Sequence, residues 1–469
     1  MAQSGSDSAG RAARSPGLRT TVARVADIAG AVTVAGIGAV CGISAGISRR
    51  ARRRQRPTIR RLLTFDATYS LSLIRERKLE HEITCRDLNG FFDHVWSVHP
   101  MVGASPEDVP GHRFTRTEVA DRHTMIEGSI ACSARLDELP VSNFLLAQVV
   151  LLFRLDRLIR DQGVCVLRAG EPFYLGLIGL ILARVNQLPL VVRINANFDL
   201  LHAEAQTACY PRLYRWRWLE KAVGRFVLRR ANLIAPGSED NLRYAVANGA
   251  EPERTTIWRY GMWVDPLHFS VEPRDRPSVR EELGLEGQPF FILVSRLAAI
   301  KRPEDAVRVL AAAKQQEPRM AAVLVGGGIM QAEIEDLARE LGVHNDLHIL
   351  GYRDQPWLAS ALSSADVVIS TLTGRALVEA CLSGTPVVAY DVEWQSELIR
   401  PDETGILVPY RDAEAMAEAV CKLVRDPELG VRLGRRARAF TAEIMDPQAL
   451  LLREIADYER LLGSRVLHS

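Results

Sequence analysis

From residue 57 onward, short apolar runs alternate with longer segments whose apolar positions follow helical spacing. This alternation is typical of α/β domains built on parallel sheets, because each crossover between parallel strands needs a helix. In the first half of the chain we expect helices over residues 144–163 and 173–187. The strands expected there are 60–66, 94–98, 164–169, 189–194, 231–237 and 255–261.

A polar, proline-containing stretch at residues 270–285 separates this series from a second one. We therefore predict an α/β fold of two Rossmann-like, doubly wound domains that face a cleft, at residues 61–270 and 271–441, with ligands at the carboxyl ends of the strands. Residues 442–469 are expected to form a C-terminal helix that packs back on the first domain. The strands expected in the second domain are 289–296, 321–328, 347–352, 366–371, 385–391 and 405–410.

The N-terminal segment has a different character. A polar, basic leader at residues 1–27 precedes an uncharged run of 20 residues at 28–47, and a basic linker follows at 48–60. Twenty uncharged residues suit a transmembrane helix, and the heavier arginine flank after the run predicts that the folded body stays on the cytoplasmic face of the cell membrane. A surface-bound helix and a disordered leader remain alternatives. Small residues four apart also predict a homodimer contact, at Gly38, Gly42 and Gly46.

Charge and composition argue against several classes of function. The net charge of +2 conceals a basic segment, because residues 1–61 carry 12 Arg and two acidic residues. The rest of the chain is therefore acidic overall, which argues against nucleic acid as its partner. Seven cysteines without a C-x-x-C spacing indicate neither a disulfide framework nor a zinc site. The ten histidines form no pair with metal-ligand spacing, so we expect no metal.

Two cations lie in the loop between an expected strand and helix of the second domain. Arg296 and Lys301 are five residues apart in the segment SRLAAIK. An arginine fork and a lysine point charge suit a pyrophosphate, and they would stabilise the negative charge that grows on a leaving phosphate. Two cations before a helix are also common as solvated charges, so the hypothesis depends on the residues around them.

The segment TLTGRALVEACLSGTPVVAYD, residues 371–391, supplies that context. It reads as a strand end, a loop, a helix, a glycine turn and a further strand. Gly374 allows close approach of the backbone before the helix, whose N-terminus offers free N–H groups to a phosphate. Glu379 follows within the helix, where its carboxylate could accept both hydroxyls of a ribose.

The second domain resembles the donor domain of family 4 (group 1) glycosyltransferases, which are retaining enzymes with two Rossmann-like domains in the GT-B fold. The similarity is dense over residues 289–441 and loose before them. It implies that Arg296 and Lys301 bind the diphosphate and that Glu379, the second Glu of the family's E-x7-E motif, binds the ribose. It implies a metal-independent reaction without a cofactor, the nucleotide sugar being the substrate. It also places a glycine loop and backbone contacts to the base at Gly327, Gly351 and Tyr352.

Several positions depart from the family pattern. The first Glu of the motif, which contacts the donor sugar in the family, is replaced by Thr371, whose hydroxyl carries no charge. Arg375 adds a cation that the pattern does not require, and Glu393-Trp394 replaces a Gly-Gly pair. The loop after the strand is still expected to hold the sugar and the phosphates. Its donor-binding residues are Thr371, Thr373, Gly374 and Arg375.

The first domain is expected to bind the acceptor. In VRINANFDL, Asn195 and Ala196 stand where the family often has His-Gly, and Asn195, Asn197 and Asp199 can hydrogen-bond a sugar hydroxyl. Residues of these types are also common turn formers. A retaining front-face reaction needs no strong base, because the leaving phosphate can take the acceptor proton. Gly261 matches the family's glycine before the chain crosses between the domains.

Residues 211–230 interleave four aromatic residues with six Arg. Such a helix could lie on anionic lipid together with residues 28–61, or it could pack its aromatic residues inward and leave the Arg solvated. Stacking on single-stranded nucleic acid is a third interpretation.

These interpretations combine into one predicted activity, that of a retaining hexosyltransferase. It would move a sugar from a UDP- or GDP-sugar to a lipid-linked or polysaccharide acceptor at the cytoplasmic face of the membrane. One alternative is a non-catalytic, nucleotide-sugar-binding membrane partner, which Thr371 favours. Another is a nucleotide-sugar epimerase, which would need clustered carboxylates that the sequence does not display.

Overall fold

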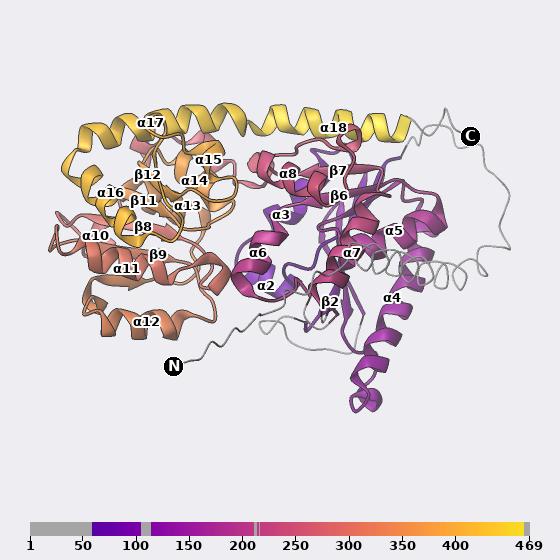
Figure 1. Ribbon diagram of the computed structural model, residues 1–469. Helices are drawn as coiled ribbons and strands as arrows, with labels where there is room; N and C mark the ends of the chain where they lie inside the picture. Colours follow the sequence, from indigo (N-terminus) through magenta and orange to yellow (C-terminus); the bar gives the residue numbers. More distant parts are fainter. Residues whose placement is uncertain (1–58, 105–113, 211–212, 215, 464–469) are drawn as a thin grey trace, which may run out of the picture.

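The computed structural model describes residues 59–104, 114–210, 213–214 and 216–463. These residues form two α/β domains side by side, each with its own sheet (Figure 1). The basic leader, the apolar run at residues 28–47 and its Gly38, Gly42 and Gly46 lie outside the described residues. Within the described part, no helix is both long and apolar enough to cross a membrane.

The first domain contains a seven-stranded sheet in the order β3-β4-β2-β1-β5-β6-β7. Its central strands are almost completely buried on both faces, which explains why they read as unbroken apolar runs. The strands are β1 (Arg61–Phe65), β2 (His94–Val102), β3 (Thr115–Ala120), β4 (His123–Ser129), β5 (Val166–Ala169), β6 (Leu190–Ile194) and β7 (Leu233–Pro236).

The edge of this sheet differs from the sequence prediction. Strand β4 runs parallel to β2, but β3 pairs with β4 in the antiparallel direction. We expected neither strand, because β3 is mostly exposed and its sequence TRTEVA alternates without a strong apolar face. The strand expected at 255–261 was wrong. Thr255 makes only an isolated bridge to Ile234, and a 3-10 helix, η4, covers Tyr260–Trp263.

Helices cover both faces of the first sheet, and a large apolar core between them joins α4, α5 and α7 to the strands. The long helix α4 begins at Pro140, and its N-terminal part extends beyond the sheet (Figure 1). The helices of this domain are α2 (Leu71–Glu76), α3 (His81–Thr84), α4 (Pro140–Gln162), α5 (Tyr174–Asn186), α6 (Phe198–Ala205), α7 (Arg217–Leu228) and α8 (Glu239–Ala247).

The second domain contains a six-stranded sheet in the order β10-β9-β8-β11-β12-β13. All of its strand pairs are parallel, as the alternating pattern predicted. Separate apolar clusters fill its two faces. The strands are β8 (Phe290–Val294), β9 (Ala321–Val325), β10 (Leu347–Ile349), β11 (Val367–Ser370), β12 (Val387–Tyr390) and β13 (Ile406–Val408).

Short helices α9 (Leu267–Ser270) and α10 (Arg280–Leu283) lie in the connection between the domains. The helices of the second domain follow its strands in turn, which is the doubly wound arrangement that places loops at the carboxyl edge of the sheet. They are α11 (Glu304–Ala313), α12 (Gln331–Glu340), α13 (Gln355–Ser364), α14 (Ala376–Leu382), α15 (Gln395–Leu398), α16 (Ala413–Arg425) and α17 (Pro427–Ile444).

The last helix returns the chain to the first domain. Figure 1 shows α17 beside the second sheet and α18 (Pro447–Gly463) continuing along the first. Tyr458 of α18 is fully buried in a cluster with Leu62 of β1 and Trp258. The indole of Trp258 donates a hydrogen bond to Asp457 at 2.8 Å. The chain therefore crosses between the domains twice.

Candidate functional site

The candidate donor site lies at the carboxyl ends of β8, β9 and β11. The loop after β8 carries Arg296 and Lys301, the loop after β9 carries residues 326–328, and the loop after β11 leads into α14. Parallel strands end at one edge of their sheet, so these three loops converge there.

The glycine loop packs directly on the backbone that follows β8. Gly326 has a φ of +133°, and a Cβ added there would lie 2.0 Å from the carbonyl oxygen of Ser295. A Cβ on Gly328 would lie 2.3 Å from the carbonyl oxygen of Leu297. Glycine is therefore required at both positions, and the close packing fixes the start of the Arg296–Lys301 loop.

Tyr352 and Gly351 complete this side of the site. The Tyr352 hydroxyl donates to the carbonyl oxygen of Gly327 at 3.2 Å, and the ring is half exposed. Gly351 has a φ of +66°, and its carbonyl oxygen accepts a hydrogen bond from Gly326 at 2.8 Å. The structure thus brings together the three residues that the resemblance assigns to the nucleotide.

Lys301 is the more enclosed of the two cations. Its Nζ lies 3.6 Å from the position that a Cβ on Gly374 would occupy, so the two loops meet at this amine. Burial, with a smaller contribution from Arg296, lowers the pKa of Lys301 to about 8. Arg296 itself is exposed. A desolvated ammonium beside an exposed guanidinium is an arrangement that can bind an anion.

Thr371 is fully buried and does not present its side chain to a ligand. Its hydroxyl donates to the carbonyl oxygen of Lys301 at 2.7 Å, and Gln395 donates to the carbonyl oxygen of Thr371 at 3.2 Å. Thr373 lies beside it and shares a hydrogen bond of 2.6 Å with Ser370. In this structure Thr371 therefore positions the Lys301 loop, in place of the sugar contact that we expected from it.

Glu379 and Arg375 lie on the helix side of the site. Glu379 is buried in α14, and its carboxylate lies 3.4 Å from the guanidinium of Arg375. Arg375 also forms an ion pair of 2.5 Å with Glu82 of the first domain. Together the two carboxylates raise the pKa of Arg375. Nothing in the sequence pointed to Glu82, because it lies in a short helix 293 residues before Arg375 and belongs to no motif.

The acceptor-side residues follow β6 of the first domain. The Asn195 carbonyl accepts a hydrogen bond of 3.0 Å from Tyr260, and the side-chain oxygen of Asn195 is buried without a partner among the described residues. Asn197 is the N-cap of α6, where its side chain accepts from Leu200 at 3.3 Å. Asn195 therefore remains a candidate acceptor ligand, whereas Asn197 has a local structural task.

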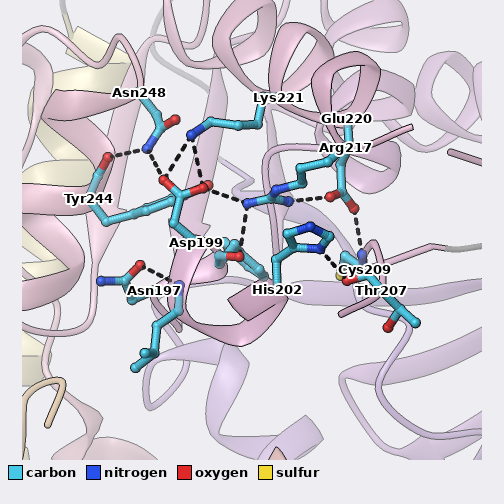
Figure 2. Close-up of polar contacts among 12 residues, drawn as sticks. Asn197, Asp199, His202, Thr207, Cys209, Arg217, Glu220, Lys221, Tyr244 and Asn248 are labelled. Carbon is cyan, nitrogen blue, oxygen red and sulfur yellow. Dashed lines mark hydrogen bonds and ion pairs between the residues drawn. The ribbon is translucent and has the colours of Figure 1, made fainter. Parts of the chain in front are cut away.

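Asp199 is engaged in a polar cluster within the first domain (Figure 2). Its carboxylate accepts from Lys221 at 2.9 Å, from Arg217 at 2.7 Å and from Asn248 at 3.3 Å. These donors come from α7 and the end of α8, so Asp199 ties α6 to both helices. This arrangement favours a structural role over the acceptor contact that we expected.

Gly261 also has a packing role. A Cβ on Gly261 would lie 2.0 Å from the carbonyl oxygen of Met445, so the two crossings between the domains touch at this point. No other residue fits there without moving the backbone between α17 and α18.

Glu393 is a residue whose place in the site the sequence did not assign. It follows β12 with a φ of +52°. Burial raises the pKa of its carboxylate, and the nearby charge of Lys301 opposes this rise. Its signal in the sequence was the replacement of a glycine pair by Glu393-Trp394.

The basic aromatic segment 211–230 divides between core and surface. Trp216 and Trp218 are exposed and stacked with ring centroids 6.1 Å apart, whereas Tyr214 and Phe226 are buried. Residues 211, 212 and 215 lie outside the described part of the chain. The inward-packing interpretation is therefore correct for two of the four aromatic residues.

Comparison with known proteins finds similarity that is concentrated in the second domain. Residues 275–440 match the family described as "Glycosyl transferases group 1". A D-inositol 3-phosphate glycosyltransferase from Nocardia farcinica is 32% identical over 217 residues, 42% of this chain and 48% of that protein. The chain thus spans about half the length of that relative. A GDP-mannose-dependent alpha-(1-6)-phosphatidylinositol monomannoside mannosyltransferase from Mycolicibacterium smegmatis is 29% identical over 193 residues, 38% of this chain and 50% of that protein.

Solved structures show the same architecture over most of the chain. The structure of Anabaena Alr3699/HepE in complex with UDP and glucose has a TM-score of 0.64 and 18% identity, and the match covers 86% of this chain and 99% of that one. At this identity the similarity establishes the fold, which is the two-domain GT-B fold.

Proposed function

We propose, from the match of residues 275–440 to the group 1 glycosyl transferases, that the whole chain is a retaining, metal-independent hexosyltransferase. It would transfer a sugar from a UDP- or GDP-sugar. The observation that carries the proposal is the convergence of Arg296, Lys301 and Glu379 on one sheet edge, beside a glycine loop that admits no side chain. A structural neighbour solved in complex with UDP and glucose supports a nucleotide sugar as the donor.

The proposed reaction assigns a task to each of these residues. The bond between the anomeric carbon and the diphosphate oxygen breaks, and a bond from the acceptor oxygen forms on the same face of the sugar. The acceptor proton passes to the departing phosphate oxygen. Arg296 and Lys301 stabilise the charge on this leaving group, and Glu379 orients the ribose. Asn195 is the residue best placed to hold the acceptor, since its buried side-chain oxygen has no partner in the described structure.

We further propose a lipid-linked or polysaccharide acceptor at the cytoplasmic face of the cell membrane. The mannosyltransferase relative, named for a phosphatidylinositol mannoside, supports a lipid-linked acceptor. Two exposed apolar surfaces on the first domain support a membrane contact. One is the stacked pair Trp216 and Trp218. The other is the exposed stripe near the start of α4, formed by Leu139, Val141, Leu145, Leu146 and Val149.

A donor screen tests the activity. The full chain is incubated with a panel of UDP- and GDP-sugars, with and without a membrane extract, and release of the nucleotide is measured. We expect one donor to turn over and the Lys301→Ala and Glu379→Ala variants to lose at least about tenfold in kcat/KM. Nucleotide binding without any turnover would instead favour the non-catalytic partner. Interconversion of two nucleotide sugars without nucleotide release would identify an epimerase.

A further inference from the structure

Glu393 adopts a backbone conformation that side chains disfavour. Its φ of +52° lies in the left-handed region, which glycine enters freely and L-residues other than Asn and Asp seldom enter. The family pattern has glycine at this position. A glutamate here therefore carries a cost in backbone conformational energy that glycine would not have. Strain of this kind is concentrated at functional sites, where the surrounding structure holds the residue in place.

One oxygen of the Glu393 carboxylate lacks a partner. This atom, Oε1, is buried and has no hydrogen-bond partner among the described residues. A buried, unpaired carboxylate oxygen is costly, and each such case in a folded protein calls for a ligand or a functional reason.

The location of this oxygen points to the transferred sugar. Gln395 of the same loop donates to the Thr371 carbonyl at 3.2 Å, and the Thr371 hydroxyl donates to the carbonyl of Lys301, the cation proposed to bind the diphosphate. Trp394, next to Glu393, packs on Tyr260 with ring centroids 5.2 Å apart, and the Tyr260 hydroxyl donates to the carbonyl oxygen of the acceptor candidate Asn195 at 3.0 Å. A sugar that passes from a diphosphate to an acceptor must lie between these two groups.

Thr371 cannot make this contact itself. It occupies the position of the family's sugar-binding glutamate, but it is fully buried and its hydroxyl is engaged by the Lys301 carbonyl. The site would otherwise present no acidic side chain to the sugar from this loop. A carboxylate from the neighbouring loop after β12 replaces the missing one.

We infer that Glu393 binds a hydroxyl of the donor sugar through Oε1, in place of the acid that the family carries at the position of Thr371. This inference rests on the proposed function and deepens it. A sugar hydroxyl would donate to Oε1, so the sugar must be a neutral or amino hexose with a hydroxyl at that point. A uronic acid would place a second carboxylate beside Glu393. Two negative charges repel each other more strongly in a buried site than in water, because the effective dielectric constant is lower there.

The test separates binding of the nucleotide from binding of the sugar. Calorimetry on the full chain gives the Kd of UDP and of UDP-glucose, or of GDP and the GDP-sugar if the donor screen selects guanine. In Glu393→Gln we expect the Kd of the free nucleotide to stay the same or fall, because a negative charge beside Lys301 disappears. The advantage of the nucleotide sugar over the nucleotide should fall about 10- to 100-fold, the loss of one charge-assisted hydrogen bond.

Two further variants keep the outcome interpretable. Glu393→Gly restores the residue that suits a positive φ, so it should fold at least as well as the native chain and lose the same sugar preference. Glu418→Gln, an exposed acid on α16, should change neither Kd. An unchanged preference in both Glu393 variants would overturn the inference, as would an equal loss of nucleotide and nucleotide sugar. If the native chain bound no nucleotide at all, the proposed function itself would fail, and the inference with it.

Discussion

The ammonium of Lys301 predicts a specific dependence of nucleotide affinity on pH. Burial lowers its pKa from 10.5 to about 8 in the nucleotide-free protein. A diphosphate binds the charged form, so the Kd of UDP should be constant below this pKa and should rise as the pH passes above it. About one Lys301 in eleven is charged one pH unit above the pKa, which corresponds to a tenfold weaker Kd and about 1.4 kcal/mol.

The measurement is a series of UDP titrations by calorimetry from about pH 7 to about pH 9.5, a range in which the terminal phosphate is already ionised. Lys301→Arg provides the matched control, because a guanidinium stays charged throughout and its Kd should be flat. Lys301→Ala should bind weakly at every pH. A native Kd that changes less than twofold between pH 7 and pH 9 would refute the reasoning, as would an equal slope in Lys301→Ala.

The same pKa shift has the opposite sign for folding. The unfolded chain keeps the Lys301 proton up to the ordinary pKa of 10.5, whereas the folded chain releases it near pH 8. The unfolded state therefore binds more protons between these two values, and the Lys301 contribution to the free energy of unfolding rises with pH across this window. Bound UDP should remove this rise, since it retains the proton in the folded state.

Variants at three further positions test the contacts described above. Thr371→Val should lower the free energy of unfolding by about 1–3 kcal/mol and weaken UDP binding, because the buried Lys301 carbonyl loses its donor, whereas Thr371→Ser should preserve both. Asp199→Asn should lower Tm by a few degrees and leave acceptor KM unchanged. A tenfold rise in that KM would instead place Asp199 in the acceptor site. Glu82→Gln removes the ion pair with Arg375 between the domains and should increase the radius of gyration in X-ray scattering. An unchanged radius would show that this pair does not hold the two domains together.

The sequence was most informative where one local pattern determines the structure. Unbroken apolar runs predicted the central strands correctly, because strands buried on both faces need apolar side chains at every position. The glycine loop at residues 326–328 was also readable, since only glycine permits the approach to the Ser295 and Leu297 carbonyls. The exposed strand β3 was not predicted, because its pairing with β4 depends on tertiary context and intrinsic strand propensity does not include that context.

The partners of individual polar side chains could not be predicted from the sequence. Asp199 looked like an acceptor ligand because it follows a strand end, but its partners Arg217 and Lys221 lie on a helix whose packing is not readable from spacing. Glu393 and Glu82 are separated by many residues of sequence from the positively charged residues near them in the fold. Charge pairs of this kind leave no periodic pattern in the sequence. The departures from the family pattern were visible, yet only the fold shows that Glu393 is near Lys301.

The contact between Gly261 and Met445 limits how this molecule can deform. The chain passes between the two domains once before α9 and once before α18, and the two passages touch at these residues. Two separate connections would let the domains slide past each other as well as rotate. Connections that touch at one point behave like a single pivot. Opening between the domains would then be a rotation about this pivot. The ion pair between Glu82 and Arg375 lies on the pivot side, because the neighbouring His81 contacts the carbonyl oxygen of Met262 at 3.2 Å. Replacement of Gly261 by a larger residue would push the passages apart and would alter the axis of motion while leaving every donor-binding side chain in place.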